Sequence, residues 1–416
     1  PTGLVGSEMC IRDRFDTNYP NDDLDLQVLW LDLAKKVGPL VRSADFGKHW
    51  KKHVDFPWNE YGIATRNLKL GVYPPESGKH NNDYWKESMG CPIRSEIWGM
   101  LCPGMPEQAA FYAKMDASLD HENFSVQAEM FLSACGSEAF FMSDPVEIIK
   151  KTQVIFQEDT SIHRLVSSVL YFQNHCSSEV AKGKIKSLWG DADFTSAPQN
   201  IAFAILALLE SKGKFEAIMG ALNLGHDSDC IAATVGALLG IINGYSNIST
   251  QWKVLVGDEL LVSPEIRGIQ YADSLSGLAQ ETCRAGISYI HHYQQVELLN
   301  CKLKPYPATS AAYNLEVDIS GVKASCLEQE QKLKLTFENL LNNGGEKDFE
   351  IKVRGEDLKF SKDTIALKEI RAFERRQFEL NVSLKKSLSS IKKTSLGFSI
   401  EVKSNGIGLG TEERGF

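Results

Sequence analysis

The sequence predicts a mainly α-helical protein in which a compact all-helical domain is followed by a small antiparallel β-sandwich. Two observations lead to this prediction. From residue 94 to about residue 300 the apolar residues recur with the period of a helix. Beyond Lys304-Pro305-Tyr306-Pro307 they alternate with polar residues, as in strands that bury one face. A chain of 416 residues is long enough to form one large core and one small core.

The composition excludes several classes of protein. With 43% hydrophobic and 24% charged residues, the chain is neither disordered nor collagen-like. It has no run of 18 uncharged apolar residues, so we expect no membrane-spanning helix. The net charge of −9 argues against binding to a nucleic-acid polymer. The acidic excess lies in residues 1–300, with 37 acidic against 25 basic residues, whereas residues 301–416 have 17 against 20.

The nine cysteines are scattered singly, without a C-x-x-C pair. This pattern argues against zinc ribbons and thioredoxin-type redox chemistry. It favours a reducing compartment, and we therefore expect a cytoplasmic location. The sequence predicts no oligomeric state.

Residues 21–37 are predicted to form the first clear helix. Asn21, Asp22 or Asp23 can cap it, two lysines lie in its last turn, and Gly38-Pro39 ends it. Because the segment is apolar on nearly every side, the helix is expected to be buried. Residues 57–93, rich in Gly, Pro and Asn, are predicted to be mostly loop.

The β-sandwich is predicted from alternation in the C-terminal quarter. The strand candidates are KLKLTF, DFEIKV, QFELNVSL and LGFSIEV, and the Asn-Asn-Gly-Gly at 342–345 is a predicted turn. We expect a non-native leader at 1–14, the helical domain at 15–303, a linker at 304–313, the β-sandwich at 314–404 and a frayed tail at 405–416.

Two acidic pairs stand at predicted helix starts, Asp22-Asp23 and Asp227-x-Asp229. Taken alone, each pair is explained by capping, because an Asp at a helix start accepts hydrogen bonds from free backbone N–H groups. A cap needs only one carboxylate, however. If the two starts meet, the crowded carboxylates require a cation, and Mg²⁺ or Mn²⁺ prefer such oxygen ligands.

These residues resemble a known family. Asn21-Asp22-Asp23-Leu24 resembles the T-D-D-T motif of ADP-ribosylglycohydrolases, and Gly225 to Gly240 resembles their G-x-D-T-D-T/C-x-A-A-x-x-G-A-x-x-G motif. The resemblance covers about residues 15–295 and implies an all-helical fold with two Mg²⁺ ions, or Mn²⁺ in their place. It implies the following metal ligands: Asp22, Asp23, Asp227, Asp229 and the amide oxygen of Asn21.

Cys230 stands at a threonine position of the motif, and we expect it to pack rather than to bind Mg²⁺. A second departure concerns the chain start. The family opens with a Gly-rich helix carrying G-D-A-L-G and a downstream Glu, and the first 14 residues here do not match it. The expected consequence is a weakened metal site.

Two further segments resemble the family's substrate-binding parts. The stretch SMGCPIRSEIWG at 88–99 is similar to its ADP-ribose loop, which implies contacts from Gly90 and Cys91. The stretch DASLDHENFSVQAEMF at 116–131 is similar to its S-L-T-H segment, which implies that His121 touches the ribose. Glu60, in the predicted loop, is a further candidate for substrate contact. Arg94 is expected to pair with Glu96 or with a substrate phosphate.

The resemblance implies metal-dependent hydrolysis of a glycosidic bond to ribose, most simply the removal of ADP-ribose from a protein or small-molecule acceptor. Asp23 and Asp227 are the catalytic candidates, one of them acting as base toward the attacking water. Two alternatives stay open. One is a catalytically impaired relative that binds an ADP-ribose-like ligand or has a structural role. The other is a phosphatase or transferase with a D-x-D motif, which needs a strand before the motif, whereas FEAIMGALNL is predicted to be helical.

Overall fold

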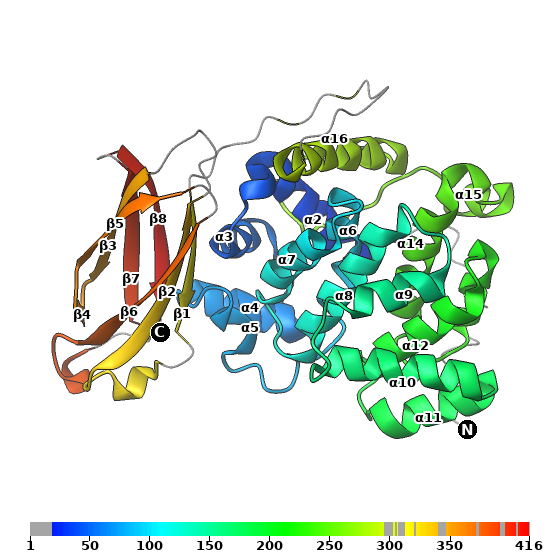
Figure 1. Ribbon diagram of the computed structural model, residues 1–416, viewed down its shortest axis with the longest axis horizontal. Coiled ribbons are helices and arrows are strands. Elements are labelled where there is room, and N and C mark those ends of the chain that lie inside the picture. Colours follow the sequence, from blue (N-terminus) through cyan, green and yellow to red (C-terminus); the bar gives the residue numbers. More distant parts are fainter. Residues whose placement is uncertain are drawn as a thin grey trace. The chain divides into compact units, whose positions relative to one another are not determined.

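The structure is a computed structural model that describes residues 19–294, 303, 306, 313–319, 322–339, 347–371, 374–391, 396–404 and 407–415. Within these residues the chain is helical as far as Tyr293 and forms strands from Tyr313 onward (Figure 1), which confirms the predicted fold class. The predicted leader at 1–14 and the predicted turn at 342–345 lie outside the described residues.

Contacts between residues divide the chain into two compact units. The first comprises residues 1–32, 84–117 and 121–306, and the second comprises residues 33–83, 118–120 and 307–416. The second unit therefore includes three short helices from the part of the sequence that precedes residue 84, in addition to the strands. The predicted domain limits stay a prediction.

The first unit is built from helices. It contains the first part of α2 (Asp22–Val37), the short η2 (Pro92–Arg94) and η3 (Phe215–Ala217), and α6 (Glu96–Leu101), α7 (Pro106–Ala117), α8 (Phe124–Ala139), α9 (Pro145–Gln153), α10 (Ser161–His175), α11 (Ser178–Trp189), α12 (Ala197–Ser211), α13 (Ile218–Leu222), α14 (Ser228–Asn247), α15 (Thr250–Val256) and α16 (Leu275–Tyr293).

Helix α2 confirms the first predicted element. It begins with three acidic residues in its first turn and ends with two lysines, which suits the direction of the helix dipole. The chain then continues into η1 (Gly38–Leu40), where Gly38 has a φ of +76°. Leu26, Leu29 and Trp30 are fully buried, as expected for a helix that is apolar on nearly every side.

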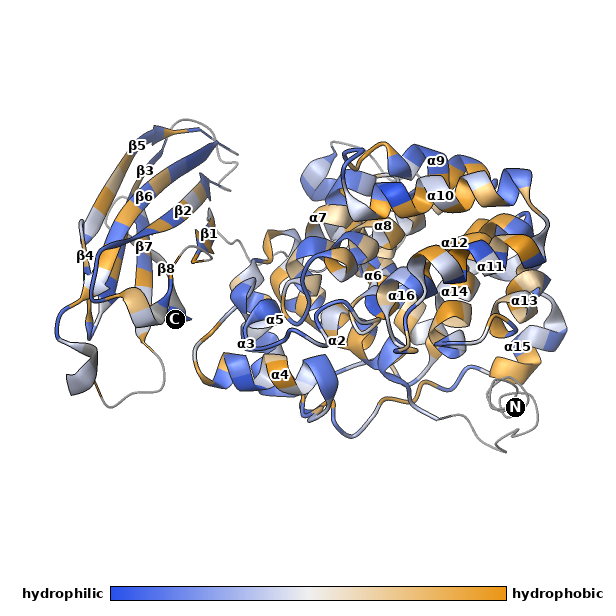
Figure 2. Cartoon of the chain, turned by 90° about the horizontal axis from the view of Figure 1, so that it is seen from below, coloured by the Kyte–Doolittle hydropathy of each residue, from blue (hydrophilic) through white to orange (hydrophobic). Residues whose placement is uncertain are grey.

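The main core of the first unit lies among α8, α12 and α14. Helix α12 is apolar over most of its surface (Figure 2), and nearly all of its side chains are buried. Helix α14 packs against α8, α12 and α13. It is also long and apolar enough to cross a membrane by length and composition, which departs from the sequence expectation. Because core helices pass the same test and α14 has these neighbours, we treat it as a core helix.

Helices α6 and α8 approach each other closely at Gly99. A Cβ added there would lie 2.7 Å from the carbonyl oxygen of Ser133 and 3.0 Å from the Cα of Gly136. Both obstacles are backbone atoms of α8 and cannot rotate away. Helix α6 is therefore fixed against α8 at van der Waals distance.

Gly99→Ala is expected to destabilise the protein by about 1–3 kcal/mol, because the extra methyl group forces α6 and α8 apart. Chemical denaturation followed by circular dichroism measures the effect. Gly183→Ala on α11 is the matched control: nothing lies within 4 Å of its added Cβ, and we expect it to be neutral or slightly stabilising. Equal stabilities for the two variants would contradict the close packing.

The prediction that residues 57–93 are mostly loop is wrong in part. The segment contains α4 (Asn59–Lys69) and α5 (Glu76–Lys79), which belong to the second unit with α3 (Ser43–His53). In α4, Tyr61, Ala64 and Leu68 are buried at helical spacing. The Gly, Pro and Asn residues that predicted loop fall mainly in the connections between these helices.

The strands form two antiparallel sheets with the orders β1-β2-β6-β4 and β5-β3-β7-β8. Their bounds are β1 (Tyr313–Asp318), β2 (Gln331–Asn339), β3 (Lys347–Gly355), β4 (Leu358–Phe360), β5 (Thr364–Ile370), β6 (Arg375–Leu384), β7 (Gly397–Ser404) and β8 (Ile407–Gly415), with η4 (Ala324–Cys326) and η5 (Leu388–Ser390) between them. The inner faces share one apolar core, in which the rings of Phe337 and Phe349 lie 4.7 Å apart, centroid to centroid.

All four predicted strand segments are strands, namely β2, β3, β6 and β7. The segment at 405–416, expected to be a frayed tail, contains β8, which pairs with β7 in antiparallel register. β8 has the sequence IGLGTEERG, in which apolar and polar residues do not alternate throughout. It lies at the edge of the sheet and pairs with β7 through backbone hydrogen bonds, which any sequence can form.

Candidate functional site

The start of α2 turns an acidic side chain inward. The Asn21 Oδ1 accepts a hydrogen bond from the Asp23 backbone N–H at 2.7 Å, so Asn21 supplies the cap. Asp22 is half-buried, whereas Asp23 is only 8% exposed. The Oδ1 of Asp23 is buried and makes no hydrogen bond to the described residues. Capping therefore does not explain why Asp23 is there.

The start of α14 has the same property. Gly225 and His226 both adopt positive φ values, +79° and +59°, and turn the chain into the helix. Asp227 stands at the cap position, but its side chain makes no capping hydrogen bond. Its backbone N–H donates instead to Oδ1 of Asn200 on α12, at 3.3 Å. Asp227 is buried and Asp229 is exposed.

The two helix starts meet, although more than two hundred residues separate them. Ligand atoms of Asp227, Asp229 and Cys230 all lie within 4.8 Å of one another. The Cys230 Sγ donates to Oδ2 of Asp23 at 3.8 Å, which joins this group to α2. Cys230 is buried, as expected for packing, but its thiol lies within the acidic group. We call Asp22, Asp23, Asp227, Asp229 and Glu96 the carboxylate cluster.

The pKa values of Asp23 and Asp227 are raised, so their protonated forms are favoured over their charged forms. Burial, and then the charges of the other cluster members, raise the pKa of Asp23 to about 8. Burial raises the pKa of Asp227 to about 7, against a hydrogen bond from Cys230, and Asp229 adds to the rise. The Cys230 thiol has a pKa well above its usual range, through burial and the neighbouring carboxylates. Among the described residues, neither Asp23 nor Asp227 forms an ion pair.

Sequence reasoning missed the fifth member, Glu96, at the first position of α6. It is 4% exposed, and burial raises its pKa to about 7. Gln27 on α2 donates from Nε2 to Oε2 of Glu96 at 3.1 Å and to the carbonyl oxygen of Asp23 at 2.9 Å. The signal was present, because Glu96 belongs to the stretch SMGCPIRSEIWG, but nothing in the sequence tells on which side of α6 it lies.

The predicted substrate residues Gly90, Cys91 and His121 are brought near one another. All three are buried, and His121 Nε2 lies 3.1 Å from Oγ of Ser88, in the loop that continues through Gly90 and Cys91 into η2. The same loop leads within a few residues to Glu96. His121 thus contacts the beginning of the loop that leads through Gly90 and Cys91 to the carboxylate cluster.

The prediction that Arg94 pairs with Glu96 or with a substrate phosphate is wrong. Arg94 pairs with Asp116 on α7 rather than with Glu96, at 2.8 Å from both Nε and Nη2, and both side chains are fully buried. Its Nη1 donates to the carbonyl oxygen of Gly90 at 3.1 Å. Burial raises the pKa of Asp116 and the Arg94 charge opposes the rise. Arg94 therefore holds the Gly90-Cys91 loop in place and is not available to a substrate phosphate.

Glu60 is not an exposed loop residue, as the sequence suggested. It lies in the first turn of α4 and is 5% exposed. It belongs to the second unit, whereas the carboxylate cluster belongs to the first. Its contact with substrate stays a prediction.

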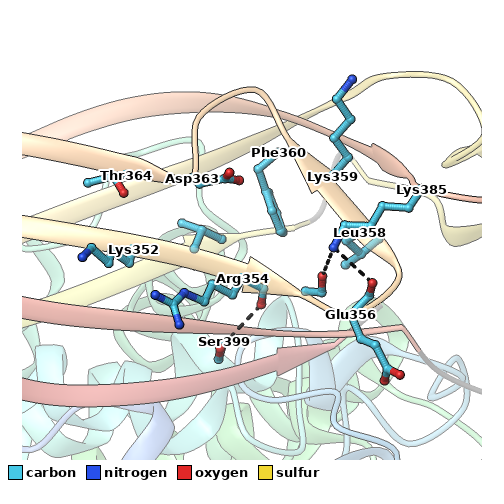
Figure 3. Close-up of a pocket in the computed structure, with 12 residues that line it drawn as sticks. Lys352, Arg354, Glu356, Leu358, Lys359, Phe360, Asp363, Thr364, Lys385 and Ser399 are labelled. Carbon is cyan, nitrogen blue, oxygen red and sulfur yellow. Dashed lines mark hydrogen bonds between the residues drawn. The ribbon is translucent and has the colours of Figure 1, made fainter.

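The strands also carry an open concavity of roughly 780 Å³ around the β3–β4 connection. Figure 3 shows that Lys359 and Glu356 point away from each other, and that the Lys385 amine donates to backbone carbonyl oxygens. Those acceptors are Gly355 at 2.8 Å and Glu356 at 3.1 Å. The charged groups do not converge on one point, so we assign no function to this concavity.

The fold and the site define a class: a helical protein whose core holds a cluster of buried carboxyl groups at the start of three helices. The family model of the ADP-ribosylglycohydrolases matches residues 2–285, about two thirds of the chain. The chain belongs to the ADP-ribosylglycohydrolase family.

No curated protein matches the chain. Among solved structures, the alkylpurine DNA glycosylase AlkC of Pseudomonas fluorescens, bound to DNA containing an abasic site analog, is matched over 96% of this chain and 99% of that chain, at 11% identity. The TM-score of 0.17 is too low for the likeness to carry any argument.

Proposed function

We propose that this protein hydrolyses a glycosidic bond to ribose with the help of divalent cations, and that it removes ADP-ribose from a protein or small-molecule acceptor. The observation that carries the proposal is the carboxylate cluster. Burial, and after it the charges of neighbouring carboxylates, raise the pKa of Asp23 and of Asp227, and neither residue forms an ion pair with a described side chain. Family membership supports the reaction class.

The cluster fits Mg²⁺ or Mn²⁺ in its chemistry. Its donors are carboxylate oxygens, which hard divalent cations prefer, and one buried Asp23 oxygen has no hydrogen-bond partner in the described part of the chain. Asp22, Asp23, Asp227 and Asp229 would hold the ions. Asn21 would be a further ligand, because its amide oxygen accepts the capping hydrogen bond with one lone pair and has a second one for an ion. Cys230 is a poor ligand for these ions and remains a protonated donor to Asp23.

Bound ions would neutralise the cluster, polarise the ribose hydroxyl groups and favour an ionised water. The side chains then have separate tasks. Asp23 or Asp227 accepts a proton from the water that attacks the anomeric carbon. The bond from that carbon to the acceptor breaks, and the acceptor leaves with the bonding electrons and takes up a proton from solvent. His121 orients the ribose, and the backbone of the Gly90-Cys91 loop contacts the ribose–phosphate side of the substrate. Arg94 keeps that loop in place through its bond to the Gly90 carbonyl oxygen.

The D-x-D phosphatase alternative finds little support. The residues just before Asp227 include α13 (Ile218–Leu222), a helix, whereas that chemistry requires a strand leading into the motif.

The experiment is a hydrolysis assay on peptides carrying ADP-ribosyl-arginine or ADP-ribosyl-serine, with Mg²⁺ or Mn²⁺. Free ADP-ribose should accumulate, and a chelator should reduce the rate to background. Metal binding without turnover would favour the catalytically impaired relative. Turnover that continues in excess chelator would contradict the role of the cations.

A further inference from the structure

We infer that Glu96 is an additional metal-binding carboxylate of this centre, oriented by Gln27. The inference rests on the proposed metal-dependent function and adds a ligand from a third helix. The two motifs that indicated metal ligands in the sequence belong to α2 and α14, and Glu96 belongs to neither.

The geometry begins with Gln27. One amide nitrogen donates both to the Asp23 carbonyl oxygen, at 2.9 Å, and to Oε2 of Glu96, at 3.1 Å. The side-chain amide of Gln27 therefore bridges the Glu96 carboxylate and the turn of α2 that carries Asp23. Gln27 follows Asp23 by four residues, so the two share one face of α2.

Helix α14 presents a matching face. Asp227, Cys230 and Thr234 follow one another at spacings of three and four residues and lie on one side of the helix. Cys230 contacts Asp23, and Thr234 lies close enough to Glu96 to stabilise its charge. Glu96 is thus linked to α2 through Gln27 and to α14 through Thr234, the two helices that carry the buried aspartates.

Glu96 has no protein cation to neutralise it. Among the described residues it forms no ion pair, and Arg94, two residues away, is taken up by Asp116. The groups that stabilise its charge are neutral, namely the Gln27 amide, Thr234 and its own backbone N–H, and a buried carboxylate without a cation remains costly. The Glu96 charge also acts on Asp23, one of the proposed ligands.

The position of Glu96 is rigid, as a metal ligand requires. On its N-terminal side, Arg94 is fixed by Asp116 and by the Gly90 carbonyl oxygen. On its C-terminal side, Gly99 packs against the backbone of α8. The backbone at Glu96 is therefore held from both sides, and its buried carboxylate is oriented by the hydrogen bond from Gln27.

The test is Mn²⁺ binding to the full chain, measured by calorimetry and by electron paramagnetic resonance of the free ion. Removal of residues that support a metal site weakens affinity roughly 10–100-fold, and we expect at least that loss for Glu96→Gln. Glu138→Gln is the matched control. Glu138 is also 4% exposed, but it lies on α8 and pairs with Lys151, so Mn²⁺ affinity should not change.

Glu96→Asp keeps the charge and moves the carboxylate back by one methylene group, and should weaken Mn²⁺ binding less than Glu96→Gln. It also serves if the Gln variant does not fold, as judged by circular dichroism. The inference would be overturned if the folded Glu96→Gln variant bound Mn²⁺ with wild-type affinity while Asp227→Asn did not bind the ion. If only the Glu96→Asp variant folds, wild-type Mn²⁺ affinity in that variant would overturn it in the same way. Absence of Mn²⁺ binding to the wild-type chain would instead overturn the proposed function itself.

Discussion

Replacing Asp227 and Asp229 together by alanine is expected to abolish Mg²⁺ and Mn²⁺ binding and, with it, hydrolysis. Loss of a residue that only supports a ligand costs roughly 10–100-fold in metal affinity, so losing two ligands costs more. The variant should still fold. Asp227 makes no capping hydrogen bond through its side chain, and removing the two carboxylates relieves repulsion within the cluster.

The chain offers a control with the same spacing. Asp191 and Asp193 also form a D-x-D pair, but Asp193 accepts hydrogen bonds from the backbone and hydroxyl groups of Thr195, at 2.9 and 2.8 Å. These bonds organise the loop before α12. The Asp191→Ala/Asp193→Ala variant should keep wild-type Mn²⁺ affinity in calorimetry. If both double variants bind Mn²⁺ as the wild type does, the carboxylate cluster is not a metal site.

The stability of the metal-free protein is expected to fall as the pH rises from about 4 to about 8. Asp23 changes its pKa from the ordinary value of 3.8 to about 8 on folding, and Asp227 and Glu96 change theirs to about 7. The folded state therefore retains protons that the unfolded state has released in this window, so stability decreases with pH. For Asp23 alone the effect is on the order of 5 kcal/mol.

Thermal unfolding at several pH values, in chelator and in excess Mg²⁺, measures this dependence. Mg²⁺ should stabilise the protein most near pH 8, because the ion takes the place of the retained protons. Asp23→Asn should unfold at a higher temperature than the wild type in chelator at pH 8, and should gain little from Mg²⁺. A melting temperature that rises with pH in chelator would contradict the assignment of these carboxyl groups.

The success of the sequence-based predictions depends on how local the signal is. Helix α2 was predicted with its cap and its end, because Asn21, the acidic first turn and Gly38 act within a few residues. Strands β2, β3, β6 and β7 were predicted because one face of each is buried, which imposes alternation. Helix α4 was missed, since its short apolar stripe lies between segments rich in turn residues.

Strand β8 was missed for a different reason. Its sequence gives no alternation, and its pairing with β7 depends on backbone groups that every residue has. Likewise, nothing around Arg94 indicates that its partner is Asp116, twenty-two residues further along the chain. The sequence offered Glu96 as the nearer acid, but that carboxylate points to the cluster instead.

The amino-acid sequence alone determined that a helical region precedes a β region, the resemblance to the family, and the four aspartates at the two helix starts. These features rest on periodicity, capping and motif spacing, which act over short stretches of chain. Only the tertiary structure decided that the side chains of Asp23 and Asp227 do not cap their helices, that Glu96 belongs to the carboxylate cluster, and that Arg94 pairs with Asp116 outside it. Which carboxylate lacks a partner depends on burial and on neighbours brought together from distant helices, and no local pattern encodes that.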